Sequence, residues 1–129
     1  MLLPELSGLT DVALLLLRLL LAALFLTSGS SHVRDPEGRG ESIGLPPAAT
    51  RLLGVVELIG GAAVGLGIAA QVGALALMGV MFGAIYKKIF EWKTGFWGED
   101  GGGWFYDLLY LVCALVTAAT GGGEFVLVP

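Results

Sequence analysis

The sequence predicts an all-α integral membrane protein, a bundle of four helices that each cross a lipid bilayer. Hydrophobic residues make up 56% of the 129 residues and charged residues only 14%, whereas soluble domains are about 25% charged. The apolar residues are also gathered into four runs, and a membrane-spanning helix needs about 20 mostly apolar residues. A chain of this length has room for one domain, so we predict a single four-span domain over residues 1–129.

The first predicted span covers about residues 10–30. Thr10 or Asp11 is placed to cap its N-terminus. No Lys or Arg precedes Arg18, and the apolar run is longer than the hydrophobic core of a typical signal peptide. The pattern therefore favours a spanning helix over a signal peptide.

The other three spans are predicted at about 47–70, 71–90 and 104–120. Pro47 stands at the start of the second span, where proline is favoured because the first turn needs no N–H donor. Almost nothing separates the second span from the third, so the two are expected to form a short helical hairpin. The fourth span ends at the three glycines 121–123, which favour helix termination. The longer connections, 32–45 and 92–103, are polar and contain several glycines.

The distribution of basic residues predicts the orientation of the bundle. Four spans place both termini and the short hairpin on one side of the membrane and the two longer loops on the other. Lys and Arg are enriched in cytoplasmic loops, so we expect cytoplasmic loops and both termini outside the cytoplasm. Tyrosines and tryptophans also gather on the loop side, as in an interfacial aromatic belt. The basic residues assigned to the loop side are Arg34, Arg39, Arg51, Lys87, Lys88 and Lys93.

Two charged residues, Arg18 and Glu57, lie deep within the apolar spans. Each costs roughly 2.5–3.5 kcal/mol in the membrane if it is unpaired. With a rise of about 1.5 Å per residue, their depths differ by a distance that an arginine side chain can cover. We therefore predict an ion pair between Arg18 and Glu57. Two roles stay open: the pair only fixes the helix register, or Glu57 binds a proton or the polar headgroup of a ligand.

A second polar group is predicted near the cytoplasmic ends of the spans, formed by His32, Tyr86 and Asp107. Histidine exchanges protons near neutral pH, so this group would suit a quinone or another polar ligand. A structural reading is open as well. Asp107 stands in the first turn of a helix, where a carboxylate interacts favourably with the helix dipole, and His32 stands at a helix end.

Glycine spacing predicts close helix packing. Gly61 with Gly65, and Gly79 with Gly83, form two Gly-x-x-x-Gly patterns, which let membrane helices approach each other. A net charge of −4 argues against a nucleic-acid partner. One cysteine and one histidine cannot supply a metal site rich in these ligands, so no metal is expected.

Taken together, these pieces resemble the DoxX family of small four-helix bacterial membrane proteins, and the resemblance covers nearly the whole chain. Two features depart from it: His32 stands where the family often has lysine, and the C-terminal segment lacks the family's usual basic residue and Ser-Leu-Asp ending. The matching pieces are Arg18, Phe25-Leu-Thr-Ser-Gly29, Leu45-Pro46, the Glu57-x-x-Gly60-Gly61 core of the second span, and Gly121-x-Gly123.

The resemblance implies a subunit of the bacterial cytoplasmic (inner) membrane that is associated with quinone-linked redox chemistry. It would hold a quinone or lipid without a covalent bond. Membrane lipid and other membrane subunits, or a second copy of the chain, are the expected partners. The sequence has no haem ligand pair, cysteine cluster or nucleotide motif, so the chain is not expected to catalyse a reaction by itself, and its catalytic residues are unknown. Two alternatives remain: a noncatalytic accessory subunit, and a small transporter or channel.

Overall fold

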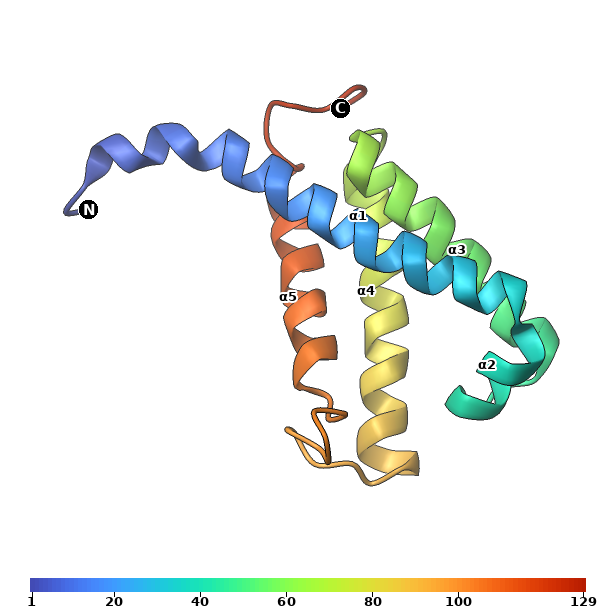
Figure 1. The fold of residues 1–129 in the computed structure, drawn as a ribbon. Helices are drawn as coiled ribbons and strands as arrows, with labels where there is room; N and C mark the ends of the chain where they lie inside the picture. The colour runs from blue at the N-terminus through green and yellow to red at the C-terminus, as the bar shows by residue number, and fades with distance from the viewer.

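The computed structural model describes residues 1–129, and its regular elements are all helical (Figure 1). Three helical stretches, Pro4–Arg34, Pro47–Leu66 and Ala70–Glu91, are long and apolar enough to cross a membrane, and a fourth apolar helix is shorter. The all-α prediction is thus confirmed. The elements are η1 (Pro4–Leu9, a 3₁₀-helix), α1 (Thr10–Arg34), α2 (Pro36–Ile43), α3 (Pro47–Leu66), α4 (Ala70–Tyr86), η2 (Lys87–Glu91, a π-helical turn) and α5 (Phe105–Thr120).

Helix α2 lies in the segment that the sequence predicts to be a polar loop. The Asp35 side chain caps it by accepting a hydrogen bond from the Gly38 N–H at 3.1 Å. Pro36 occupies its first turn, and Gly44 ends it in the left-handed conformation, with φ at 72°. These are standard start and stop signals of a helix. The helix between them has only eight residues and no apolar run, so the sequence pattern does not predict it. Helix α1 also extends to Arg34, so His32 lies on the helix.

The predicted cap of α1 is wrong, because Leu9 precedes the helix and supplies no side-chain cap. The short helix η1 continues directly into α1. The Thr10 hydroxyl donates to the Ser7 carbonyl oxygen at 2.7 Å. Asp11 instead accepts a hydrogen bond from the Glu124 N–H at 3.0 Å, which ties the C-terminal segment to the start of α1.

Helices α1 and α3 pack antiparallel with almost no space between their backbones. A Cβ added to Gly29 would lie 2.8 Å from the Gly54 carbonyl oxygen, and one added to Gly65 would lie 2.8 Å from the Ala22 Cβ. A Cβ added to Gly61 would lie 3.4 Å from the Phe25 Cβ of α1. The packing role predicted for Gly61 and Gly65 therefore agrees with the structure.

Gly79 and Gly83 do not take part in helix packing. A Cβ added to either residue would meet no atom within 4 Å. The prediction that these two glycines bring helices together is wrong, because α3 crosses α4 nearer to the turn between them. There a Cβ on Gly73 would lie 2.8 Å from the Ala63 Cβ.

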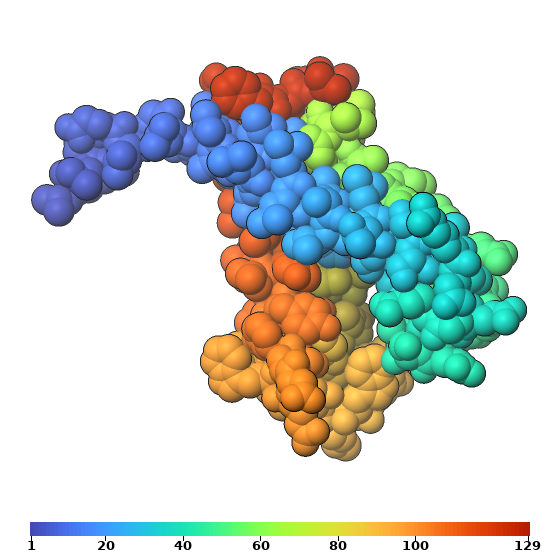
Figure 2. Space-filling view, in the orientation of Figure 1, coloured from blue at the N-terminus to red at the C-terminus, as the bar shows by residue number.

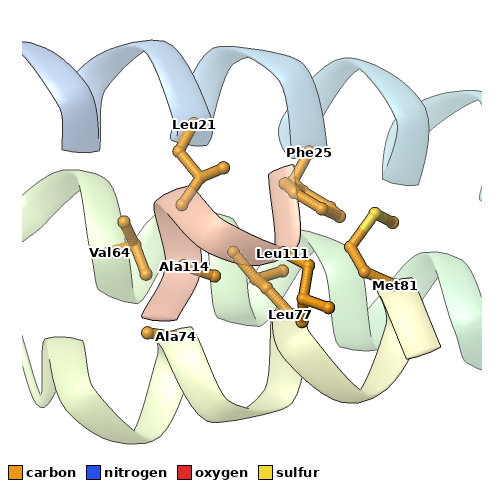
Figure 3. Packing of buried hydrophobic residues seen from close by; sticks show 8 residues of the cluster. All are labelled: Leu21, Phe25, Val64, Ala74, Leu77, Met81, Leu111 and Ala114. Carbon is orange, nitrogen blue, oxygen red and sulfur yellow. The ribbon is translucent and has the colours of Figure 1, made fainter. Parts of the chain in front are cut away.

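The hydrophobic core lies where α1, α3, α4 and α5 meet (Figure 3). Met78 and Cys113 pack against its edge. Apolar residues on the outer helix faces are exposed, such as Leu16, Leu52 and Val72, as expected for helices surrounded by lipid. The core residues are Leu21, Phe25, Val64, Ala74, Leu77, Met81, Leu111 and Ala114.

The C-terminal segment folds back over the turn between α3 and α4 (Figure 1). Val128 bridges to Ile68, and its N–H donates to the Gly67 carbonyl oxygen at 2.9 Å. At the other end of the molecule, the Lys87 ammonium donates to the Gly44 carbonyl oxygen at 3.3 Å. The N-terminal helix η1 projects away from the rest of the chain (Figure 2).

Candidate functional site

Arg18 does not pair with Glu57, contrary to the sequence prediction. The Arg18 side chain is 1% exposed, and its guanidinium donates to four backbone carbonyl oxygens. Two belong to the last turn of α3, Val64 at 2.8 Å and Gly65 at 3.2 Å. Two belong to the C-terminal segment, Gly122 at 3.2 Å and Phe125 at 2.6 Å. Arg18 therefore caps α3 and holds the C-terminal segment.

The register of α1 against α3 explains the correction. The close contacts at Ala22–Gly65 and Gly29–Gly54 fix the antiparallel alignment, and this alignment places Arg18 beside the C-terminal end of α3. The last carbonyls of a helix lack partners within the helix and carry the negative end of its dipole. They therefore satisfy a buried arginine without a carboxylate.

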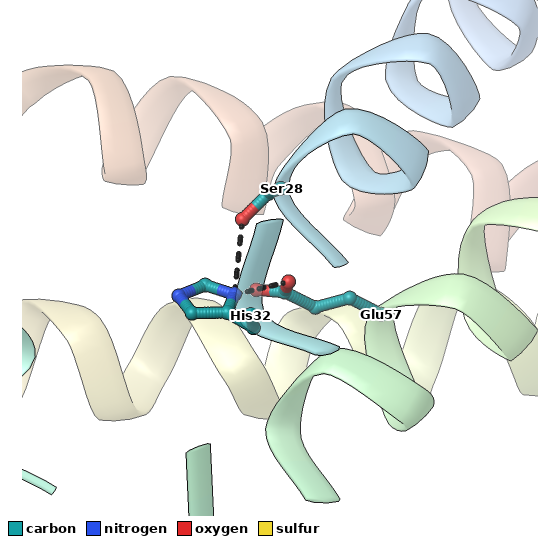
Figure 4. Close-up of polar contacts among 3 residues, drawn as sticks. All are labelled: Ser28, His32 and Glu57. Atoms are coloured by element: carbon teal, nitrogen blue, oxygen red, sulfur yellow. Dashed lines mark hydrogen bonds and ion pairs between the residues drawn. The ribbon is translucent and has the colours of Figure 1, made fainter. Parts of the chain in front are cut away.

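Glu57 pairs with His32 instead (Figure 4). The His32 Nδ1 lies 2.9 Å from the Glu57 Oε2, and the Ser28 hydroxyl lies 3.5 Å from the same ring nitrogen. Both side chains of the pair are at most 5% exposed. The other ring nitrogen, Nε2, points away from Glu57 and Ser28 (Figure 4). It is buried and has no hydrogen-bond partner.

A second buried ion pair joins η2 to α5. The Lys88 ammonium lies 2.8 Å from the Asp107 carboxylate. It also contacts the Tyr106 hydroxyl and donates to the Gly103 carbonyl oxygen at 3.3 Å. Lys88 belongs to a π-helical turn, a feature that often occurs at functional sites because it changes the direction of side chains within a helix.

Both ion pairs lie on the wall of one cavity of about 890 Å³. All five helices contribute to its lining. Most of the lining residues are hydrophobic, 15 of 26, and the space-filling view shows a hollow below α1, between α2 and α5 (Figure 2). Small-molecule sites in proteins have volumes of about 300–1,000 Å³ and few polar groups, so the cavity has the dimensions and lining of a ligand site. Its polar and charged lining side chains are Ser28, His32, Arg39, Ser42, Glu57, Lys87, Lys88 and Asp107, and the hydrophobic lining residues Trp92, Tyr106 and Tyr110 add polar N–H and O–H groups.

The structure brings only part of the predicted polar group together. His32 and Asp107 line the same cavity, on α1 and α5. Tyr86 does not: it is 58% exposed, and its ring packs on Phe90 with 5.1 Å between the ring centroids. The tyrosine that lines the cavity beside Asp107 is Tyr106, the preceding residue of α5.

Three basic residues of the cavity lining, Arg39, Lys87 and Lys88, are not identified from the sequence as site residues. For Lys88 a signal exists, because Ala74, Met81 and Lys88 recur every seven residues and share one helix face. The first two are in the core, so this face had to point inward. Arg39 lies on α2, and its Nε is buried without a partner. No sequence signal placed it, because α2 was not predicted.

The chemistry of the site is that of hydrogen bonding and proton exchange. When Glu57 is ionised it can only accept, so the His32 Nδ1 carries the proton and Nε2 of the neutral ring is an acceptor. Lys88 and the Tyr106 hydroxyl supply donors on another part of the wall. No group of three or more His, Cys, Asp and Glu side chains is arranged to hold a metal ion.

Comparison with known proteins gives the family. The pattern of the DoxX family matches residues 13–92. The chain belongs to the DoxX family. It is also 30% identical over 122 residues to a Bacillus subtilis (strain 168) protein named "Putative oxidoreductase CatD", and the aligned region covers 92% of this chain and 87% of that protein. No solved structure matches the chain.

The DoxX match can be placed on the site. Residues 13–92 include Arg18, His32, Glu57 and Lys88. Asp107, on α5, lies outside the matched region. The part of the chain that shows the family therefore contains the complete His32–Glu57 pair and one half of the pair between η2 and α5.

Proposed function

We propose that this DoxX protein is a membrane subunit of quinone-linked redox machinery, and that its cavity binds the headgroup of a quinone or quinol. The observation that carries the proposal is His32, a buried histidine that is held by Glu57 at 2.9 Å and has no partner for its Nε2. Family membership and the oxidoreductase name of the Bacillus subtilis relative support the redox association.

The His32–Glu57 pair suits a quinol hydroxyl. Its Nε2 would accept a hydrogen bond from the hydroxyl and would take the proton when the quinol is oxidised, because the Glu57 carboxylate stabilises the imidazolium that forms. The protonated Nε2 would then donate a hydrogen bond to the carbonyl oxygen of the quinone. Burial strengthens this interaction, since few water molecules compete for the nitrogen. The ordinary alternative for a buried polar atom is a partner within the protein, and the Nε2 has none.

The second ion pair suits the other end of the same headgroup. A quinone has oxygens on opposite sides of its ring, and the cavity has polar groups on separate parts of its wall. Lys88 and Tyr106 would donate to the oxygen at this end, which is a hydroxyl oxygen in the quinol and a carbonyl oxygen in the quinone, while Asp107 holds the ammonium in place at 2.8 Å. The apolar lining between the two pairs would contact the ring faces.

The proposal includes an arrangement in the membrane. The helices would cross the bacterial cytoplasmic membrane with the α2 end and the 92–104 loop facing the cytoplasm, in line with the basic residues on that side. Electrons from the ligand would pass to a redox cofactor carried by a partner protein. Because oxidation of a quinol releases two electrons and two protons, the chain would bind and orient the ligand while one proton passes to His32 and the other to the Asp107 carboxylate.

Binding to the purified protein tests the proposal. Trp92 lines the cavity, so a bound quinone should quench its fluorescence in lipid nanodiscs. The variant His32→Asn keeps an N–H near the Nδ1 position and removes Nε2. We expect it to weaken binding by about tenfold, the equivalent of one hydrogen bond, and Glu57→Gln to weaken binding in the same direction. The control Glu5→Gln, on the exposed helix η1, should leave the affinity unchanged.

Saturable binding that is lost in His32→Asn and kept in Glu5→Gln would support the proposal. Absence of saturable binding to the unaltered protein would overturn it and favour a noncatalytic accessory subunit. Equal affinity in the unaltered protein and His32→Asn would show that the ring nitrogen takes no part.

A further inference from the structure

We infer that the ligand of the cavity carries an apolar tail, and that this tail leaves the cavity sideways between α3 and α4, across Gly79 and Gly83. The inference rests on the proposed function and defines its ligand class: a lipid-soluble quinone or quinol with a hydrocarbon tail, in place of a small water-soluble one.

Helices α3 and α4 touch at one end and separate toward the other (Figure 1). Near their turn, a Cβ added to Gly60 would lie 2.9 Å from the Leu77 side chain. Farther along α4, a Cβ added to Gly79 or Gly83 would meet nothing within 4 Å. The cavity occupies the space where the two helices part.

The cavity reaches the molecular surface between these helices. Gly79 and Gly83 are exposed and line the cavity. Leu52 on α3 lines it as well and is 65% exposed. Residues that are at once exposed and part of the lining mark where the cavity opens. One opening lies between α3 and α4, at Leu52, Gly79 and Gly83, and another lies at the loop end of the cavity, at Ser42, Trp92 and Gly102.

The opening between α3 and α4 is apolar, whereas the part of the cavity farther from this opening carries polar groups. Its borders on α3 and α4 carry alanine, valine, leucine and glycine side chains. The unpartnered Nε2 of His32, a residue 4% exposed, and the Lys88–Asp107 pair lie deeper in the lining. A ligand that satisfies both regions needs a polar head and an apolar extension. The apolar border residues are Ala49, Leu52, Val56, Ala76, Gly79, Val80 and Gly83.

Depth in the membrane favours lipid on the outside of this opening. Gly79 and Gly83 follow the start of α4 at Ala70 by about 14 and 20 Å along the helix axis, at about 1.5 Å per residue. The hydrocarbon layer is about 30 Å thick, so both glycines would face acyl chains. The missing side chains leave a shallow surface on which a hydrocarbon tail can lie.

Two ligands with one headgroup test the inference: a quinone with a ten-carbon tail and the same quinone ring without a tail. Binding of each is measured in nanodiscs to the unaltered protein and to Gly79→Leu/Gly83→Leu. We expect the double variant to weaken binding of the tailed quinone by about tenfold and to leave binding of the tailless ring within about twofold. Val72→Leu, on the exposed face of α4 outside the cavity, is the control for added bulk and should change neither affinity.

A milder variant guards against a folding defect. Gly79→Ala/Gly83→Ala adds methyl groups where nothing lies within 4 Å, and it should fold normally and weaken the tailed quinone by a smaller factor. Equal weakening of both ligands, or no weakening of either, would overturn the tail route while leaving the headgroup site intact. If neither ligand binds the unaltered protein, the proposed function fails and the tail route fails with it.

Discussion

The His32 Nδ1 lies 2.9 Å from the Glu57 Oε2 and joins α1 to α3 inside the helix bundle. Both side chains are almost fully buried. The pair exists because Gly29 and Gly54 let the two helix backbones touch, which sets His32 level with Glu57. A packing contact between glycines thus determines which charged groups meet.

The His32–Glu57 pair should behave as an energetically coupled unit. We expect Glu57→Leu to lower the free energy of unfolding by roughly 3–5 kcal/mol, because it leaves one polar partner buried alone. The double variant His32→Leu/Glu57→Leu should lose less than the sum of the two single variants. Thermal unfolding in detergent micelles measures the three losses. Losses that simply add would show that the two side chains do not interact.

The two neighbouring lysines of η2 should differ sharply. Lys88→Met leaves Asp107 buried without its counter-ion and is expected to cost roughly 3 kcal/mol or more of unfolding free energy. Lys87→Met removes an exposed ion pair to Glu91, expected to be worth about 0.2–1 kcal/mol, and an exposed hydrogen bond at 3.3 Å to the Gly44 carbonyl oxygen, expected to be worth about 1 kcal/mol. The same unfolding measurement compares the two variants. A similar loss in both would contradict the buried pair.

Arg18 should control the C-terminal segment. Arg18→Met removes the side-chain hydrogen bonds to the Gly122 and Phe125 carbonyl oxygens and leaves the segment beyond α5 held by the bonds of Glu124 to Asp11 and of Val128 to Gly67, so we expect the segment to open more often. Limited proteolysis followed by mass spectrometry should then show cleavage after Gly121 at least several times faster than in the unaltered protein. Arg51→Met, at an exposed arginine, is the control. An unchanged cleavage rate in Arg18→Met would contradict the role of Arg18 as a clamp.

Substitution by alanine should change the stability of the protein in opposite directions at two glycines, Gly29 on α1 and Gly79 on α4. At Gly29 the new methyl group would lie 2.8 Å from a backbone oxygen, and such overpacking is expected to cost about 1–3 kcal/mol. At Gly79 it meets open space, and the better helix propensity of alanine should stabilise α4 by up to about 1 kcal/mol. Unfolding midpoints of Gly29→Ala and Gly79→Ala test this contrast. A stable Gly29→Ala would show that the α1–α3 contact is looser than described.

Apolar runs were enough to predict the helical class and the approximate spans, since length and hydrophobicity largely determine which segments can form membrane helices. The Arg18–Glu57 prediction failed because depth was counted from nominal span ends. Register depends on which glycines touch, and the spacing of Gly29 relative to Gly54 along the chain does not reveal that contact.

The candidate site was predicted only in part. His32 and Asp107 were identified because ionisable residues at the ends of apolar runs are conspicuous. Lys88 was recoverable from its helix face, whereas Arg39 was not, because it reaches the cavity through α2 and the packing of that short polar helix is tertiary. Gly79 and Gly83 show the same limit. The Gly-x-x-x-Gly spacing occurs in close helix packing at Gly61 and Gly65 but in an open cavity wall at Gly79 and Gly83.

Photolabelling tests the central claim most directly. A quinone that carries a photoreactive azide is added to membranes containing the protein, and the sample is irradiated. The labelled residues are then mapped by mass spectrometry. The proposed cavity predicts labels on its lining, near His32, Tyr106 and Trp92, that disappear when excess unmodified quinone is present. Labels confined to exposed lipid-facing residues such as Leu16 and Leu109, with no competition by unmodified quinone, would contradict a quinone site in this cavity.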